Sequence, residues 1–219
     1  NKAALVAVAG RGADGRARYR QFSFAELNEA SDCYARGLER VGICRGVRTV
    51  LMVRPSLEFF ALVFALFKVG AVPVLVDPAI GLKKLRTCLQ EVEPEAFIGL
   101  SVAHVARLLM GRSLSSIRIN VTVGARWFWG GYRLRQLKDE SGPAYVMADT
   151  EPEETAAILF TSGSTGVPKG AIYSHGMFSA QVDMLGAMYR FSDDEIDLPT
   201  FPLFALFDPA LGMTAVLPE

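Results

Sequence analysis

The chain has 219 residues, of which 51% are hydrophobic and 21% are charged, a composition that supports a sizeable core and excludes a disordered chain. The 23 Lys and Arg residues balance the 23 Asp and Glu residues, and no long run of either sign stands out. The totals therefore predict neither a nucleic-acid track nor a patch for an anionic membrane, and a small molecule is the expected partner.

Short β-rich runs alternate with helical ones along the chain. A first helix is expected over residues 24–40, because Ser23 and Glu26 form a capping-box pattern and Gly42 supplies a stop. Hydrophobic periodicity and turn signals predict the other elements. The expected strands are 48–53, 72–76, 96–100, 117–123 and 156–160, and the further expected helices are 56–69, 82–92, 101–110 and 175–189. This order predicts an α/β fold with a largely parallel sheet flanked by helices.

Three further segments have a less regular pattern. The alternating Arg16, Arg18 and Arg20 are typical of a solvated strand edge. Residues 138–154 are acidic and contain Gly and Pro, which predicts an exposed connection, whereas residues 125–135 show no clear periodicity.

Two apolar stretches, 59–76 and 199–218, approach the length of a membrane span. Charged residues, Pro and Gly interrupt both, so no integral membrane segment is predicted. No signal peptide is expected either. The chain starts at Asn1 without a methionine and stops at Glu219 just after an apolar segment, so we expect both ends to be cut.

The three cysteines, Cys33, Cys44 and Cys88, are odd in number and widely spaced. This spacing favours neither a disulfide framework nor a zinc site, suits a reducing cytoplasm, and predicts a packing role for all three.

The chemistry is concentrated in residues 161–170, with the sequence TSGSTGVPKG. Glycines let the backbone turn sharply and bring its N–H groups close to an anion, the hydroxyls add donors, and Lys169 adds a positive charge. ATP is the expected ligand. The order of residues differs from a Walker A loop. A flexible Ser/Gly linker is the alternative, but strand-like runs at 156–160 and 171–173 flank the loop and argue against it.

The decapeptide matches the signature loop of the AMP-forming adenylating superfamily, which contains acyl-CoA synthetases, adenylation domains of peptide synthetases and luciferases. Residues 64–78 resemble the family's "LKAGA-x-x-VPLDP" block, and residues 22–27 resemble its early "Y-x-EL" segment. The resemblance covers nearly the whole chain. It implies that residues 1–219 form a partial N-terminal adenylation domain, with the rest of that domain and the C-terminal domain absent.

The resemblance implies a two-step chemistry that uses ATP and Mg²⁺. A substrate carboxylate attacks the α-phosphorus and gives acyl-AMP and pyrophosphate, after which a second nucleophile displaces AMP. Lys169 and Thr165 are the implied catalytic residues, and Thr165 is also the implied neighbour of Mg²⁺. The implied phosphate-binding residues are Thr161, Ser162, Gly163, Ser164, Thr165, Gly166 and Lys169. Because the family's magnesium glutamate, ribose aspartate and catalytic lysine lie further downstream, this piece alone is expected to be inactive.

Residues 198–213 resemble the corresponding segment of olefin-pathway β-lactone synthetases, and Ala205 replaces the histidine of many acyl-CoA synthetases. The resemblance implies a long-chain β-hydroxy acid whose own hydroxyl closes a β-lactone without CoA. Phe204 and Phe207 line an alkyl channel in this scheme, although plain core is the commoner role of such a run. Asp208 either orients the β-hydroxyl or caps a helix ahead of Pro209.

The two histidines receive structural interpretations first. His175 follows the loop by one short strand and is a candidate for the substrate pocket, but a capping or packing role at the start of a helix is favoured. His104 is expected to be structural.

Two other functions stay open for the whole protein. An ordinary fatty acyl-CoA ligase with an unusual pocket is the nearest alternative, and a nucleotide-binding or docking module without catalysis is the second. A complex with other enzymes of the pathway is a further expected partner.

Overall fold

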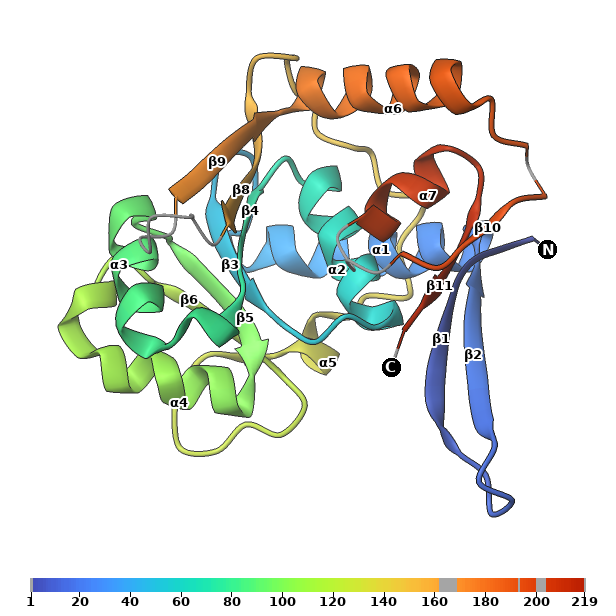
Figure 1. Ribbon diagram of the computed structural model, residues 1–219. Helices are drawn as coiled ribbons and strands as arrows, with labels where there is room; N and C mark the ends of the chain where they lie inside the picture. Colours follow the sequence, from blue (N-terminus) through green and yellow to red (C-terminus); the bar gives the residue numbers. More distant parts are fainter. Residues whose placement is uncertain (1, 162–168, 193, 200–203, 219) are drawn as a thin grey trace.

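The computed structural model describes residues 2–161, 169–192, 194–199 and 204–218, and contains two β-sheets with helices packed around them (Figure 1). The larger sheet has seven strands in the order β7-β6-β5-β3-β4-β8-β9, and the smaller has four in the order β10-β11-β1-β2. The strands are β1 (Ala3–Arg11), β2 (Ala17–Ser23), β3 (Arg48–Met52), β4 (Val72–Val76), β5 (Ala96–Leu100), β6 (Ile119–Val123), β7 (Tyr132–Arg133), β8 (Thr155–Thr161), β9 (Lys169–Ser174), β10 (Ile196–Asp197) and β11 (Thr214–Leu217). The α-helices are α1 (Phe24–Arg40), α2 (Leu57–Lys68), α3 (Leu82–Val92), α4 (Ser101–Met110), α5 (Leu134–Leu137), α6 (His175–Tyr189) and α7 (Phe207–Ala210).

The larger sheet is parallel except for its last pair, in which β9 runs antiparallel to β8. Helices cover both of its faces, so successive residues of each strand enter different cores. Along β3, Val50 packs in the cluster that contains residues of α3, while Leu51 packs in the cluster that contains residues of α1 and α2. The predicted α/β class with a largely parallel sheet is therefore confirmed.

The predicted helix start at residue 24 is confirmed by its cap. The Ser23 hydroxyl accepts a hydrogen bond from the Glu26 backbone N–H at 3.2 Å, and the Glu26 carboxylate accepts one from the Ser23 N–H at 2.8 Å. The two reciprocal bonds satisfy backbone donors that the first helical turn leaves free. The α1 helix then packs along α2, and both helices contribute to the core on one face of the larger sheet.

The smaller sheet was not predicted. Its hairpin, β1 and β2, is joined by β11, which pairs in parallel with β1 although about 200 residues separate them in sequence. The Thr214 hydroxyl donates to the Ala3 carbonyl at 2.6 Å and supports this pairing. Arg18 and Arg20 lie exposed on β2, an edge strand of this sheet, as the alternating arginines predict.

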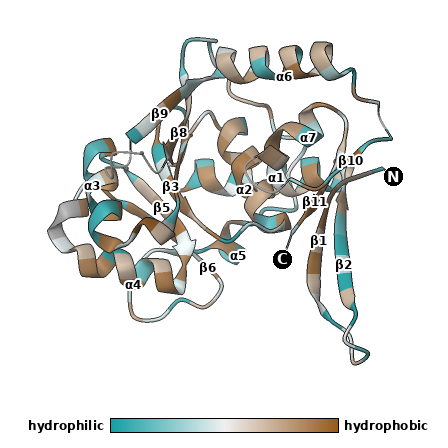
Figure 2. Ribbon diagram, in the orientation of Figure 1, coloured by the Kyte–Doolittle hydropathy of each residue, from teal (hydrophilic) through white to brown (hydrophobic). Residues whose placement is uncertain are grey.

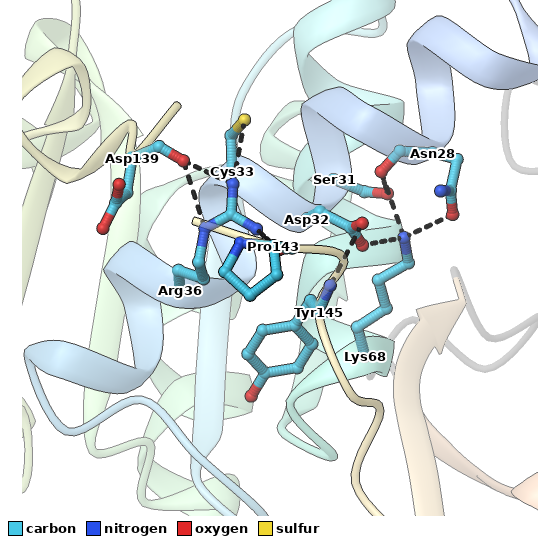
Figure 3. Close-up of polar contacts among 9 residues, drawn as sticks. All are labelled: Asn28, Ser31, Asp32, Cys33, Arg36, Lys68, Asp139, Pro143 and Tyr145. Carbon is cyan, nitrogen blue, oxygen red and sulfur yellow. Dashed lines mark hydrogen bonds and ion pairs between the residues drawn. The ribbon is translucent and has the colours of Figure 1, made fainter. Parts of the chain in front are cut away.

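The connection between α5 and β8, predicted to be exposed, is anchored over part of its length (Figure 3). Lys68, the last residue of α2, forms an ion pair with Asp32 of α1 at 2.5 Å and a hydrogen bond with the Asn28 side chain at 2.7 Å. The second Asp32 oxygen accepts from the Tyr145 backbone N–H at 3.2 Å, and Arg36 donates to the Asp139 carbonyl. This network ties the connection to the α1–α2 pair.

Two other expectations concern the cysteines and membrane segments. Cys33 and Cys88 are buried, but Cys44 is exposed, so the packing role predicted for Cys44 is wrong. It lies in the connection between α1 and β3, where the chain turns at the surface. Among the residues that the structure describes, no helix is both long enough and apolar enough to cross a membrane.

Candidate functional site

The carboxyl ends of the parallel strands form the edge of the larger sheet where a ligand site is expected. The chain leaves β3 toward α2 on one face, and it leaves β5 toward α4, which belongs to the other face. Neighbouring strands whose connections go to opposite faces leave a crevice at their carboxyl ends, the usual place for ligands in open α/β sheets. The loop at 161–170 begins at this edge, because it follows the carboxyl end of β8.

A cavity of about 810 Å³ lies at this edge. The ends of β3, β4, β5 and β8 form its floor, and α3 and α4 contribute one wall. Its lining is mostly apolar, with Arg54 and Asp77 as the charged members. No sequence signal singled it out, although the rule for strand ends identifies this edge once the strand order is known.

The strands on both sides of the loop are paired with each other. Phe160 lies opposite Gly170 and Thr161 lies opposite Lys169 in the antiparallel β8–β9 ladder. A flexible linker has no such paired flanks, so the linker interpretation is wrong. The Lys169 side chain is exposed at the first position of β9. The predicted phosphate-binding residues Ser162, Gly163, Ser164, Thr165 and Gly166 lie outside the described residues.

His175 lies at the opposite end of β9 from Lys169. The six residues of β9 separate the two by roughly 20 Å, given a rise of about 3.3 Å per residue. The His175 backbone N–H donates to the Glu154 carbonyl at 3.0 Å, and its ring contacts Phe67 edge-on at 6.5 Å between centroids. Burial lowers the pKa of His175. These contacts support the packing role of His175. The length of β9 keeps His175 away from the loop at 161–170.

Phe204, Phe207 and Asp208 lie together at α7, apart from the residues that line the cavity. Phe204 is 62% exposed. Phe207 contacts Phe178 of α6, with 6.0 Å between ring centroids. Phe207 therefore lies at the α6–α7 contact, and neither Phe204 nor Phe207 lines the cavity at the sheet edge.

Asp208 is buried inside the first turn of α7 and does not cap it. The N-cap position is Leu206, which makes no side-chain cap bond, so the capping alternative for Asp208 is wrong. The Asp208 Oδ2 atom has no hydrogen-bond partner among the described residues. Burial, followed by the charge of Asp197, raises the pKa of Asp208 to about 6. A buried carboxylate oxygen without a partner is costly and is a candidate for contact with a ligand.

Within the described ranges, no group of three or more His, Cys, Asp or Glu side chains gathers in a way that would hold a metal ion. The predicted neighbour of Mg²⁺, Thr165, lies in the undescribed part of the loop.

Two curated relatives share more than half of their aligned residues with this chain. The olefin beta-lactone synthetase of Xanthomonas campestris pv. campestris is 53% identical over 218 residues, which are 99% of this chain and 39% of the relative. The enzyme of the same name from Stenotrophomonas maltophilia is 55% identical over 199 residues, 90% of this chain and 36% of the relative. The chain thus spans less than two fifths of either relative's length.

Solved structures with lower identity share the fold. A long-chain-fatty-acid-CoA ligase from Archaeoglobus fulgidus gives a TM-score of 0.82 at 20% identity, over 99% of this chain and 44% of that one. The apo structure of MbtA from Mycobacterium smegmatis gives a TM-score of 0.82 at 22% identity, over 99% of this chain and 40% of that one. The family model described as AMP-binding enzyme matches residues 1–217. With the paired flanks of the loop, this match shows that the chain belongs to the AMP-binding family of adenylate-forming ligases.

Proposed function

We propose that the whole protein uses ATP to activate a long-chain β-hydroxy acid as acyl-AMP, with release of pyrophosphate. The substrate's β-hydroxyl then loses its proton, attacks the acyl carbon and displaces AMP, which closes a β-lactone in olefin biosynthesis. The observation that carries this proposal is the 53% and 55% identity to two olefin beta-lactone synthetases. The chain corresponds to part of the N-terminal adenylation domain, residues 1–219, and by itself is expected to be inactive.

In this proposal the loop at residues 161–170 binds the phosphates of ATP. Backbone N–H groups and hydroxyls of residues 161–166 hold the β- and γ-phosphates, and the exposed Lys169 at the start of β9 neutralises part of their charge. Mg²⁺, held by the phosphates with Thr165 nearby, would neutralise further charge on the oxygens. The protein's contribution is mainly positioning, because the substrate carboxylate is itself the nucleophile.

Asp208 is the candidate for recognition of the β-hydroxyl. Its buried Oδ2 is free to accept a hydrogen bond from a substrate hydroxyl, and the nearby Phe207–Phe178 contact offers an apolar wall for the alkyl chain. A site that is built to bond a hydroxyl discriminates strongly against an analogue without one, because its buried polar group is then left unpaired.

The first experiment measures ATP–pyrophosphate exchange by the full-length protein with a β-hydroxy fatty acid, followed by analysis of the product. Lactone formation without CoA supports the proposal, strict dependence on CoA indicates the acyl-CoA ligase, and no exchange with any fatty or aryl acid indicates a module without catalysis. Lys169→Ala is expected to slow exchange by about 10²-fold. Lys138→Ala, at an exposed lysine that pairs with Glu140, is the matched control and should leave the rate unchanged.

The second experiment compares a β-hydroxy acid with the same acid lacking the hydroxyl. Asp208→Ala should reduce the ratio of the two kcat/KM values by at least about tenfold, mainly through loss of the hydroxy substrate. An unchanged ratio would remove Asp208 from the proposed pocket without affecting the assignment of adenylation to the loop.

Cytoplasmic location and assembly with other pathway enzymes belong to the same proposal. The three cysteines are free, which suits a reducing compartment. Co-purification of the full-length protein with enzymes that make its acid or consume its lactone would test the assembly.

A further inference from the structure

Residues 96–138 carry a positive charge that the balanced totals conceal. This run contains seven of the 23 Lys and Arg residues and none of the 23 Asp and Glu residues. The rest of the chain therefore has 16 Lys and Arg residues and 23 Asp and Glu residues. The formal charge is +7 on this run and −7 on the remainder of the chain. The totals alone predict no patch for an anionic surface, because they average over this asymmetry.

The run builds the β5–β6–β7 side of the larger sheet together with α4 and α5 (Figure 1). Between β6 and the edge strand β7 lies the loop 124–131, which contains Trp127 and Phe128. These side chains are 56% and 79% exposed, although both are large and apolar. Neighbouring large apolar side chains that stay in water commonly mark an interaction site.

Trp129, between the exposed aromatics and the sheet, fixes the loop. It is buried, its indole N–H donates to the Thr122 hydroxyl at 2.9 Å, and its ring stacks on the buried His104 with 5.2 Å between centroids. Trp127 and Phe128 contact Trp129 at 5.7 and 5.3 Å between centroids. The loop is thus anchored through one aromatic residue and presents the other two outward.

Backbone conformation also holds the loop in this form. Gly131 has a φ of +98°, and a Cβ atom there would lie 2.4 Å from the Asn120 carbonyl oxygen, so only glycine fits. The Arg126 guanidinium donates to the Gly131 carbonyl and closes the base of the loop. The presentation of Trp127 and Phe128 is therefore a property of the folded loop.

Arginine and aromatic side chains can bind different parts of a lipid surface. Arg126 adjoins Trp127 in sequence, Arg133 adjoins the exposed Tyr132, and Arg135 is exposed on α5. Trp, Tyr and Phe rings bind at the boundary between headgroups and acyl chains, and Arg binds anionic headgroups. We propose that loop 124–131, with the half-buried Arg126 and Arg133 and the exposed Arg135 near it, docks the protein on an anionic lipid bilayer.

The test measures co-sedimentation of the full-length protein with vesicles, one set of pure phosphatidylcholine and one with 30% phosphatidylglycerol. The Trp127→Ser/Phe128→Ser double variant should bind the anionic vesicles at least about tenfold more weakly than wild type. Arg135→Glu should weaken binding severalfold, as should a rise in NaCl from 0.1 to 0.5 M, because both reduce attraction to the headgroups. Tyr19→Ser is the matched control, since Tyr19 is 60% exposed between two exposed arginines on β2.

Wild-type binding that prefers anionic vesicles, is lost in the double variant and is retained in Tyr19→Ser would support the proposal. Equal binding by wild type and double variant would overturn it. Failure of the wild-type protein to bind vesicles would also overturn it. This holds even if the Trp127→Ser/Phe128→Ser substitutions abolish a complex with another protein, because the loop would then be a protein-binding site. Circular dichroism of each variant reports whether the fold is intact, and because binding is measured without substrate, the outcome is independent of the proposed reaction.

Discussion

The helices α2 and α6 are both apolar, but they lie in different surroundings (Figure 2). Eight of the 12 residues of α2 are buried. None of the 15 residues of α6 is buried against the described part of the chain, and Met177, Met184 and Met188 are exposed. Apolar composition alone therefore did not determine whether a helix of this protein is covered.

The difference follows from what flanks each helix. The α2 helix packs against α1 on one side and the larger sheet on the other. The α6 helix contacts β9 and a few aromatic rings, among them Phe67 and Phe207. An apolar helix without cover is an incomplete packing unit, so we expect other parts of the whole protein to cover α6.

The largest expected effect lies inside α2. Phe60 is fully buried, so Phe60→Ala should lower the free energy of unfolding by about 3–5 kcal/mol, through lost transfer energy and the cavity left behind. Urea denaturation measures the change. A loss below about 1 kcal/mol would mean that α2 is not the core helix that the structure shows.

The ion pair at the end of α2 is the next test. Lys68→Met keeps most of the apolar stem but leaves the buried Asp32 carboxylate without its cation, which should cost about 3 kcal/mol. Adding Asp32→Asn should restore much of the loss, because no unpaired charge then remains buried. If the double variant is no more stable than Lys68→Met, the pair is not the source of the effect.

The third test concerns Asp208 of α7, the short helix that contacts α6 through Phe207. Its pKa in the folded state is about 6, above the ordinary value of 3.8. The protonated form is therefore favoured by folding, and this stabilisation is present below about pH 4 and lost as the pH rises through 6. The loss should amount to about 2–3 kcal/mol. The Asp208→Asn variant should not show this pH-dependent loss. The free energies of unfolding of the wild type and of the variant should therefore diverge between pH 4 and 7. Parallel curves would contradict the raised pKa.

The smallest expected effect is on α6 itself. Met184→Ala should change the free energy of unfolding of this 219-residue chain by less than about 0.5 kcal/mol, since the side chain is exposed. The same substitution in the full-length protein should cost more, by the area that its cover buries. Equal small losses in both proteins would mean that α6 stays uncovered.

Local pattern predicted most of the larger sheet and its helices. The α1 helix and its Ser23–Glu26 capping box, α2, β4 and α3 lie where periodicity and turn signals indicate. The strand predicted over residues 117–123 begins two residues later, at Ile119. These elements were predictable because helical and strand periods and caps are encoded by residues close together in sequence.

The candidate site was predictable only in part. The strands around the loop were expected and are paired with each other, whereas the cavity was not expected because it depends on which strand ends lie side by side. Asp208 was singled out from its sequence neighbours, but its burial and its unpartnered Oδ2 depend on packing around α7. The same limit applies to Trp127 and Phe128, since no periodicity indicates that Trp129 holds them outward.

The sequence by itself determined the class of fold, the loop and the family resemblance, because these depend on spacing within a few residues or a few short segments. Tertiary structure alone decided the strand order, the β1–β11 pairing and the different cover of α2 and α6. The physical reason is that burial and strand pairing depend on residues distant in sequence, and whether an apolar segment is buried depends on which other surface packs against it.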